Sequence, residues 1–181
     1  LQEQRVAFLI PSGFQYVAPQ WGIWRAGGIA VPLCISHPKP ELDYVIADSD
    51  ASIIIAHPSF EALLRPIAEE RNIRFILTSE TLPENVSLLP KIEITRRGLI
   101  LYTSGTTGKP KGVVSTHQNI QAQVTSLVSA WGWTADDRIL HVLPLHHIHG
   151  IINVLTCALW SGAECHILPK FDAEIVSDRI S

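Results

Sequence analysis

Short apolar runs alternate along the chain with segments in which apolar residues recur every three or four positions. The short runs are rich in Val, Ile and Leu and predict buried strands. They cover residues 5–10, 29–33, 52–56, 74–77, 99–101, 113–116, 138–143 and 163–168. The wider spacing predicts helices over residues 14–24, 42–46, 60–67, 120–131 and 151–160, and a further helix begins near Asp172.

The first of these helices has a clear apolar spacing and one internal proline. Spacings of three, four and three predict a single buried face, made of Phe14, Val17, Trp21 and Trp24. Pro19 lies inside the pattern, where it either lowers helix stability or produces a kink. The pair Gly27-Gly28 is typical of a helix end.

Strands that alternate with helices predict an α/β fold with layered, mostly parallel sheets flanked by helices. We expect α/β units over residues 1–77 and a polar loop with Pro83 and Pro90 over residues 78–97. Residues 98–181 then contain the candidate chemistry.

Composition narrows the class of protein. The chain has 181 residues, of which 46% are hydrophobic and 17% are charged, so it can form a full core. A net charge of −3 argues against nucleic-acid binding, and no apolar run approaches the roughly 20 residues of a membrane span. Three widely spaced cysteines predict no disulfide framework. Because the chain begins at Leu1 and lacks methionine, we expect it to be part of a longer protein.

The densest candidate chemistry lies between the runs at 99–101 and 113–116. The segment Tyr102–Gly112 reads YTSGTTGKPKG and predicts a loop between two strands. Glycine backbone, hydroxyl groups and lysines are typical of phosphate binding. The candidate ligands are Thr103, Ser104, Gly105, Thr106, Thr107, Gly108, Lys109 and Lys111. The spacing is not that of a Walker A loop, because only two residues separate Gly105 from Gly108 and a strand follows.

TSGTTGKPKG resembles the signature loop of the adenylate-forming superfamily, which includes acyl-CoA synthetases, peptide-synthetase adenylation domains and luciferases. In that family the loop cradles the β- and γ-phosphates of ATP. The family lysine falls at Lys111, which the resemblance implies is catalytic, while Lys109 occupies a variable position. Residues 24–33 and 42–49 also resemble family segments, and we interpret both as structural. The resemblance covers nearly the whole chain and implies the large N-terminal AMP-binding domain.

A second candidate segment, Pro144–Gly150, reads PLHHIHG and follows a predicted strand. His146 and His149 are three residues apart, so a metal site is one interpretation, but no Cys, Asp or Glu accompanies them. Half-buried structural histidines are the second interpretation, preferred for His141 and His146. The third comes from resemblance to the family motif PLxHxxG. It implies that His147 is catalytic, lining the acyl pocket and gating it before adenylation, and that His149 less directly lines the same pocket.

The resemblance implies a two-step reaction that uses ATP, Mg²⁺ and coenzyme A. A carboxylic acid forms an acyl-adenylate, and a thiol then displaces AMP. The wording around both motifs looks most like the malonyl-CoA synthetase branch, so malonate or a similar short acid is favoured. A medium- or long-chain fatty acid, an amino acid of a peptide-synthetase domain, and a non-catalytic nucleotide-binding homologue remain alternatives.

Several parts of the family's machinery do not occur in this sequence. They are the adenine-binding segment with its glutamate, the ribose-binding aspartate and the C-terminal lid domain. We therefore expect this chain alone not to turn over substrate. The compartment, cytoplasmic or mitochondrial, and the oligomeric state are not predicted. Asp172, the nearest candidate for binding an amino-acid ammonium, is more simply interpreted as a helix cap.

Overall fold

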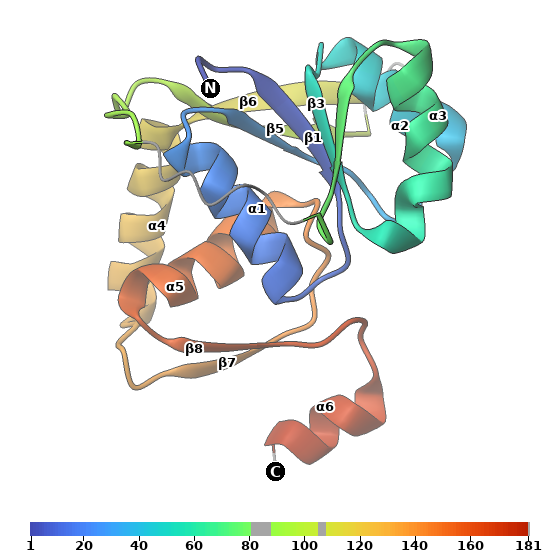
Figure 1. Ribbon diagram of the computed structural model, residues 1–181. Helices are drawn as coiled ribbons and strands as arrows, with labels where there is room; N and C mark the ends of the chain where they lie inside the picture. The colour runs from blue at the N-terminus through green and yellow to red at the C-terminus, as the bar shows by residue number, and fades with distance from the viewer. Residues whose placement is uncertain (81–87, 105–107, 181) are drawn as a thin grey trace. The chain divides into compact units, whose positions relative to one another are not determined.

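The computed structural model describes residues 1–80, 88–104 and 108–180. These residues form two compact units, Leu1–His117 and Gln118–Ser181. Figure 1 shows the ribbon with its elements labelled.

The first unit contains a six-stranded sheet in the order β4-β3-β1-β2-β5-β6. The first five strands pair in parallel, and only β6 is antiparallel, to β5. The strands are β1 (Arg5–Leu9), β2 (Ile29–Pro32), β3 (Ile53–Ala56), β4 (Arg74–Leu77), β5 (Arg97–Thr103) and β6 (Lys111–Thr116). This arrangement confirms the expected α/β fold with a mostly parallel sheet.

Three helices connect the parallel strands and cover both faces of the sheet (Figure 1). They are α1 (Phe14–Arg25), α2 (Lys39–Asp48) and α3 (Glu61–Glu70), the last preceded by a short 3₁₀ turn, Pro58–Phe60. Apolar residues of α2 and α3 share a core with Ala7 and Leu9 of β1. On the opposite face of β1, the Phe8 ring lies 5.2 Å from that of Tyr16 in α1. Between β4 and β5, the described residues form no helix or strand.

Helix α1 does not bury the face that its apolar spacing predicts. Its buried residues are Tyr16, Gln20, Ile23 and Trp24, whereas Phe14 is 82% exposed. Of the predicted face only Trp24 is fully buried, and its indole nitrogen donates to the Gly98 carbonyl at 2.7 Å. Pro19 lies inside the helix, which continues to Arg25. Gly27 ends it with a left-handed φ of 78°, as predicted.

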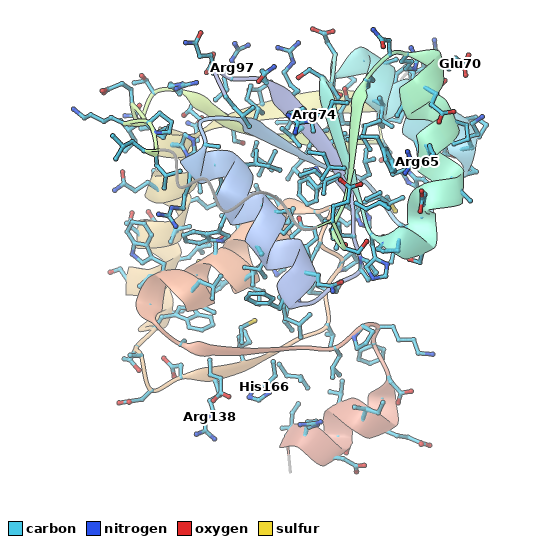
Figure 2. The ribbon with its side chains drawn as sticks, viewed as in Figure 1. Arg65, Glu70, Arg74, Arg97, Arg138 and His166 are labelled. Carbon is cyan, nitrogen blue, oxygen red and sulfur yellow. The ribbon has the colours of Figure 1, made fainter. Side chains whose placement is uncertain are left out.

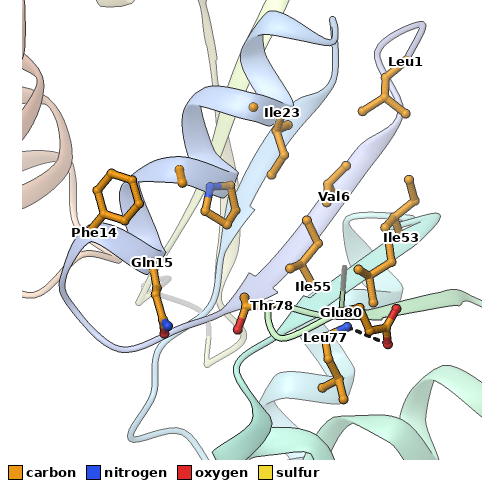
Figure 3. Close-up of a pocket in the computed structure, with 14 residues that line it drawn as sticks. Leu1, Val6, Phe14, Gln15, Ile23, Ile53, Ile55, Leu77, Thr78 and Glu80 are labelled. Atoms are coloured by element: carbon orange, nitrogen blue, oxygen red, sulfur yellow. Dashed lines mark hydrogen bonds between the residues drawn. The ribbon is translucent and has the colours of Figure 1, made fainter. Parts of the chain in front are cut away.

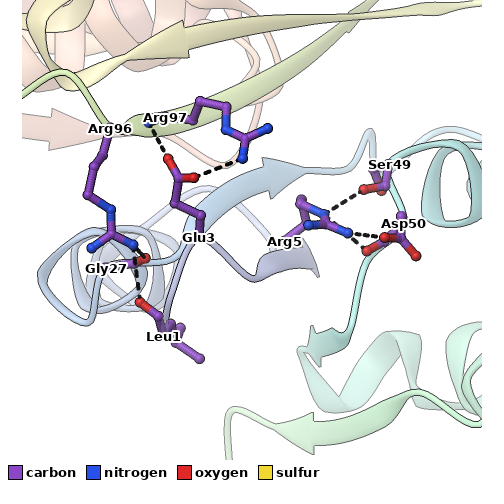
Figure 4. Close-up of polar contacts among 8 residues, drawn as sticks. All are labelled: Leu1, Glu3, Arg5, Gly27, Ser49, Asp50, Arg96 and Arg97. Carbon is purple, nitrogen blue, oxygen red and sulfur yellow. Dashed lines mark hydrogen bonds and ion pairs between the residues drawn. The ribbon is translucent and has the colours of Figure 1, made fainter.

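Arginines connect the N-terminal residues to β5 and to the end of α2 (Figure 4). Arg97 donates to the Glu3 carboxylate at 2.8 Å, and this hydrogen bond lowers the pKa of Glu3 to about 2. Arg96 donates to the Gly27 carbonyl at 2.9 Å. Arg5 contacts the Ser49 carbonyl and the Asp50 carboxylate. The starts of β1, β2 and β5 are thus joined by charged hydrogen bonds.

Most other charged side chains lie on the surface, as the stick view shows (Figure 2). Arg65 of α3 pairs with Glu61 one turn earlier at 2.6 Å, and its guanidinium lies 4.6 Å from the centre of the Phe75 ring. Exposed pairs of this kind contribute about 0.3–0.5 kcal/mol each. The stability of this unit therefore depends mainly on its apolar core.

The second unit contains a parallel pair of strands, β7 (Arg138–His141) and β8 (Glu164–Ile167). Between them lie a π-helical segment, η2 (His149–Thr156), and α5 (Cys157–Ser161), which ends at Gly162 with φ 77°. The sequence predicts one helix here, and the π geometry was not foreseen. Helix α4 (His117–Trp131) begins at the unit boundary, and α6 (Ala173–Ile180) follows β8.

One smaller prediction is confirmed in this unit. The Asp172 carboxylate accepts hydrogen bonds from the backbone N–H groups of Glu174 and Ile175, so Asp172 caps α6. Cys157 is a buried free thiol whose pKa is raised by burial. Among the described residues, no helix is long and apolar enough to cross a bilayer.

Candidate functional site

The phosphate-loop candidate connects β5 to β6, as the sequence predicts. In the antiparallel register Thr103 lies opposite Lys111 and Tyr102 lies opposite Gly112. The loop therefore begins after Thr103 and ends before Lys111, and its two ends are adjacent. The register therefore places Thr103, with its hydroxyl, and Lys111, with its ammonium, opposite each other at the loop end of this hairpin.

Several candidate ligands of the loop are accessible. Thr103, Ser104, Gly108, Lys109 and Lys111 are all exposed. Gly108 has a φ of 91°, a conformation that residues with a side chain rarely adopt. The other predicted loop residues, Gly105, Thr106 and Thr107, lie outside the described residues. The described part offers two lysines and two hydroxyls as donors to an anion.

Both ends of the loop contact α2, a feature that the sequence analysis missed. The Tyr102 hydroxyl donates to the Asp48 carboxylate at 2.7 Å. The Tyr44 hydroxyl donates to the Pro110 carbonyl at 3.1 Å, and the Lys109 ammonium lies 5.6 Å from the centre of the Tyr44 ring. Burial, followed by the hydrogen bond to Asp48, raises the pKa of Tyr102, so its phenol remains a donor at neutral pH.

The histidine segment begins with a structural histidine. His141 is 1% exposed at the end of β7. Its Nε2 lies 2.9 Å from the Gly150 carbonyl, and its Nδ1 accepts from the Leu143 N–H at 3.1 Å. This pattern fits a neutral ring protonated at Nε2, and burial lowers its pKa. The structural interpretation of His141 is confirmed.

Gly150 allows the segment to turn sharply into η2. A Cβ atom at this position would lie 2.4 Å from the Pro144 carbonyl oxygen, which is backbone and cannot rotate away. The glycine of the PLxHxxG pattern is therefore required for close packing of Pro144 against the start of the helix.

The remaining histidines of the segment differ in exposure. His146 is half-buried, and its ring lies 4.1 Å from that of the exposed His147. His149 is exposed, and its Nδ1 lies 3.1 Å from the side-chain amide nitrogen of Asn153. In the described part of the chain no three His, Cys, Asp or Glu side chains are grouped to hold a metal. His147 and His149 are thus available to hydrogen-bond a small molecule.

The two candidate segments belong to different units. Thr103, Ser104, Gly108, Lys109 and Lys111 belong to the first unit, and His147 and His149 to the second. The described ends of the loop lie at β5 and β6 and contact α2, and the histidine segment joins β7 to η2.

An apolar groove of about 550 Å³ lies between α1 and the edge of the sheet (Figure 3). Ile23 lines it from α1, and Val6, Ile53 and Ile76 line it from the strands. Among the described residues that line it, Glu80 alone carries a carboxylate, which accepts a hydrogen bond from the Leu77 N–H. None of the described candidate residues of the loop or of the histidine segment lines this groove, and its described walls are mostly apolar and do not suit a phosphate.

Known proteins resemble this chain in sequence and in fold. The mitochondrial malonate–CoA ligase ACSF3 of Xenopus laevis is 50% identical in an alignment 177 residues long, which covers 93% of this chain and 31% of that protein. Its Homo sapiens counterpart is 45% identical over 99% of this chain and 32% of its own length. The chain thus spans about a third of the length of the curated relatives that it matches.

Comparison with solved structures agrees with the comparison of sequences. The crystal structure of ATP-bound MatB from Rhodopseudomonas palustris superposes with a TM-score of 0.89 at 27% identity, over 98% of this chain and 37% of that one. The sequence model of the AMP-binding enzyme family matches residues 1–180. That match includes the loop, its flanking strands and nearly every other residue of the sequence. The chain therefore belongs to the AMP-binding enzyme family.

Proposed function

We propose that the protein containing this chain is an ATP-dependent acid–thiol ligase, and that its acid is malonate. The observation that supports this most directly is the β5–β6 hairpin, in which exposed Thr103 and Lys111 lie opposite each other on either side of a loop of phosphate-binding composition. The names of the two ACSF3 relatives, malonate–CoA ligases, support the choice of acid.

In the first step, a carboxylate oxygen of the acid attacks the α-phosphorus of ATP. A P–O bond forms, the bond to the β-phosphate oxygen breaks, and pyrophosphate leaves. Lys111, Thr103 and Ser104 are placed at one end of the hairpin, where they would neutralise and orient that leaving group. Gly105, Thr106, Thr107 and Gly108 complete the proposed loop, with Lys109 in a supporting role.

Mg²⁺ fits this site as a companion of ATP. Where Mg²⁺ is bound through nucleotide phosphates, the protein supplies only one or two ligands. The described residues contain no group of three His, Cys, Asp or Glu side chains that could hold a metal ion by themselves. When bound, the ion would neutralise charge on the phosphates.

In the second step, the thiol of coenzyme A attacks the acyl carbon of the adenylate. A thioester bond forms, the C–O bond to the phosphate breaks, and AMP leaves. His147 and His149 are the candidates to line the acyl pocket because both rings are exposed. A dicarboxylic acid needs a hydrogen-bonding or cationic partner for its second carboxylate, and an imidazole can supply one.

The proposed location is the mitochondrion. Both ACSF3 relatives are named as mitochondrial proteins. Import of the intact protein into isolated mitochondria, with protection from added protease, tests this. Full sensitivity to protease after the import reaction would favour the cytoplasm.

The test of the function is pyrophosphate exchange into ATP by the intact protein that contains this chain. Malonate, methylmalonate, acetate, palmitate and amino acids would be compared in parallel. We expect exchange with malonate. Exchange only with palmitate or with an amino acid would replace malonate by the fatty-acid or peptide-synthetase alternative. No exchange with any acid would favour a non-catalytic nucleotide-binding homologue.

The same assay separates the two lysines of the loop. Lys111→Ala should lower the exchange rate by about 10²-fold or more, the scale on which one preorganised charge acts in a transition state. Lys109→Ala is the matched control, since it removes the same group two residues away and should cost much less. Equal losses in both variants would contradict the special role of Lys111.

A further inference from the structure

The surface of α2 that faces the phosphate loop carries two polar contacts one helical turn apart. Tyr44 and Asp48 are four residues apart, so their side chains lie on the same side of the helix. Tyr44 reaches Pro110 at the end of the loop, and Asp48 reaches Tyr102 at its beginning. One short stretch of one helix thus contacts both ends of the loop.

Helix α2 is a rigid base for such contacts. Leu42, Val45 and Ile46 are buried in the core that α2 shares with the sheet. Ile100 belongs to the same core, and Tyr102, two residues later in β5, packs against it. Since residues two apart in a strand share a face, Tyr102 points toward α2.

The strand after the loop accommodates this arrangement. Gly112 lies opposite Tyr102 in the register. A Cβ atom at Gly112 would lie 3.2 Å from a carbon of the Tyr102 ring and 3.3 Å from its hydroxyl oxygen. The absence of a side chain at Gly112 leaves the ring room to direct its hydroxyl at Asp48.

We propose that Tyr44, Asp48 and Tyr102 are positioning residues that fix both ends of the phosphate loop against α2. They do not touch the reacting atoms. They order Lys109 and the start of β6, and so place Lys111 before ATP arrives, which lowers the entropic cost of binding the phosphates. This inference rests on the proposed ATP chemistry and gives a role to the segment 42–49, which the sequence predicted to be only structural.

The first test compares the ATP kinetics of the intact wild-type protein with those of variants that each change one hydrogen-bonding side chain. Tyr44→Phe keeps the ring beneath Lys109 and removes the hydroxyl, and Tyr102→Phe removes the donor to Asp48. Each should lower kcat/KM for ATP by about 3- to 10-fold, the effect of one neutral hydrogen bond, while KM for the acid stays unchanged. Asp48→Ala should act like Tyr102→Phe, and Asp48→Asn, which keeps an acceptor, should restore most of the activity.

The third tyrosine of the chain is the matched control. Tyr16 is buried in α1, and its hydroxyl has no hydrogen-bond partner among the described residues. Tyr16→Phe removes the same atom away from the loop and should leave kcat/KM for ATP unchanged. If Tyr44→Phe and Tyr102→Phe behaved like Tyr16→Phe, or if Asp48→Asn lost as much activity as Asp48→Ala, the proposal would be overturned.

A second readout does not depend on activity. Trypsin cuts after Lys111 but not after Lys109, which precedes proline. In a Tyr44→Phe/Asp48→Ala variant, cleavage after Lys111 should accelerate several-fold, whereas cleavage after the exposed Lys170 should not change. The variant could be cleaved faster after Lys111 in a protein that shows no ATP chemistry. That result would support the anchoring of the loop on α2 and contradict the proposed function. Unchanged cleavage after Lys111 would overturn the anchoring.

Discussion

At the scale of single residues, Gly112 shows how one missing side chain shapes the loop. A Cβ atom there would lie 3.0 Å from the Ile100 side chain and 3.2 Å from the Tyr102 ring. We expect Gly112→Ala to destabilise the protein by about 1–3 kcal/mol because it overpacks this contact. Urea unfolding of the wild-type protein and the variant measures the difference.

A matched glycine provides the control. Gly22 lies inside α1, and nothing lies within 4 Å of a Cβ atom built there. Gly22→Ala should stabilise the protein by about 0.5–1 kcal/mol, because alanine loses less backbone entropy in a helix. Equal effects at Gly22 and Gly112 would contradict the packing argument.

Local sequence patterns predicted the structural place of some residues and missed that of others. The positions of Thr103 and Lys111 on either side of the β5–β6 loop and the capping role of Asp172 follow from local sequence. The contact of Tyr44 with Pro110 joins residues 66 positions apart, and no spacing rule links them. The buried face of α1 was predicted wrongly because the pattern weighs apolar residues only, whereas this helix buries Tyr16 and Gln20 and exposes Phe14.

At the scale of elements, the turn from β7 into η2 depends on Gly150. An added Cβ atom would meet the Pro144 carbonyl oxygen at 2.4 Å, so the turn would have to open. Opening it moves the Gly150 carbonyl away from the His141 imidazole. We expect Gly150→Ala to lower the free energy of unfolding by about 2–3 kcal/mol, measured by urea denaturation.

His147→Ala separates stability from function in the same turn. This ring is exposed, so its removal should change stability by no more than about 0.5 kcal/mol but raise KM for the acid. If Gly150→Ala proved as mild as His147→Ala in unfolding, the close packing at Gly150 would not be required.

The elements themselves were predicted well where their signals are local. Every predicted strand forms, since short runs of branched residues between Gly, Pro and Asp leave little alternative. The π geometry of His149–Thr156 was not predicted, because an apolar run has the same composition in an α-helix and in a π-helix. Here Thr156 donates its hydroxyl to the Ile151 carbonyl at 2.7 Å, five residues earlier.

At the scale of the whole molecule, the two units each contain a histidine whose pKa is lowered by burial. They are His117 in the first unit, where Arg96 adds to the effect, and His141 in the second. Both rings therefore favour the neutral form when folded. As pH falls below the ordinary value of 6.5, the unfolded chain binds protons that the folded protein does not, so stability decreases.

Unfolding midpoints in urea at pH 7.5 and pH 5.5 measure this dependence. The midpoint should be lower at pH 5.5, and His141→Gln should reduce the difference between the two values, even if its midpoint is lower at both. Between pH 7.5 and pH 8.5 His141 is neutral in both the folded and the unfolded protein. This range is therefore the internal control, in which His141→Gln should leave the pH dependence unchanged. An unchanged dependence between pH 7.5 and pH 5.5 in His141→Gln would show that His141 does not contribute to it.

We propose that the protein containing this chain cleaves ATP to AMP in a reaction that joins malonate to a thiol. The most direct measurement follows labelled ATP with the intact protein, malonate, coenzyme A and Mg²⁺, and identifies every nucleotide and acyl product. We predict AMP, pyrophosphate and malonyl-CoA in equal amounts, and no ATP loss without malonate. ADP as the nucleotide product, or ATP consumption that is independent of malonate, would contradict the proposed AMP-forming reaction with malonate.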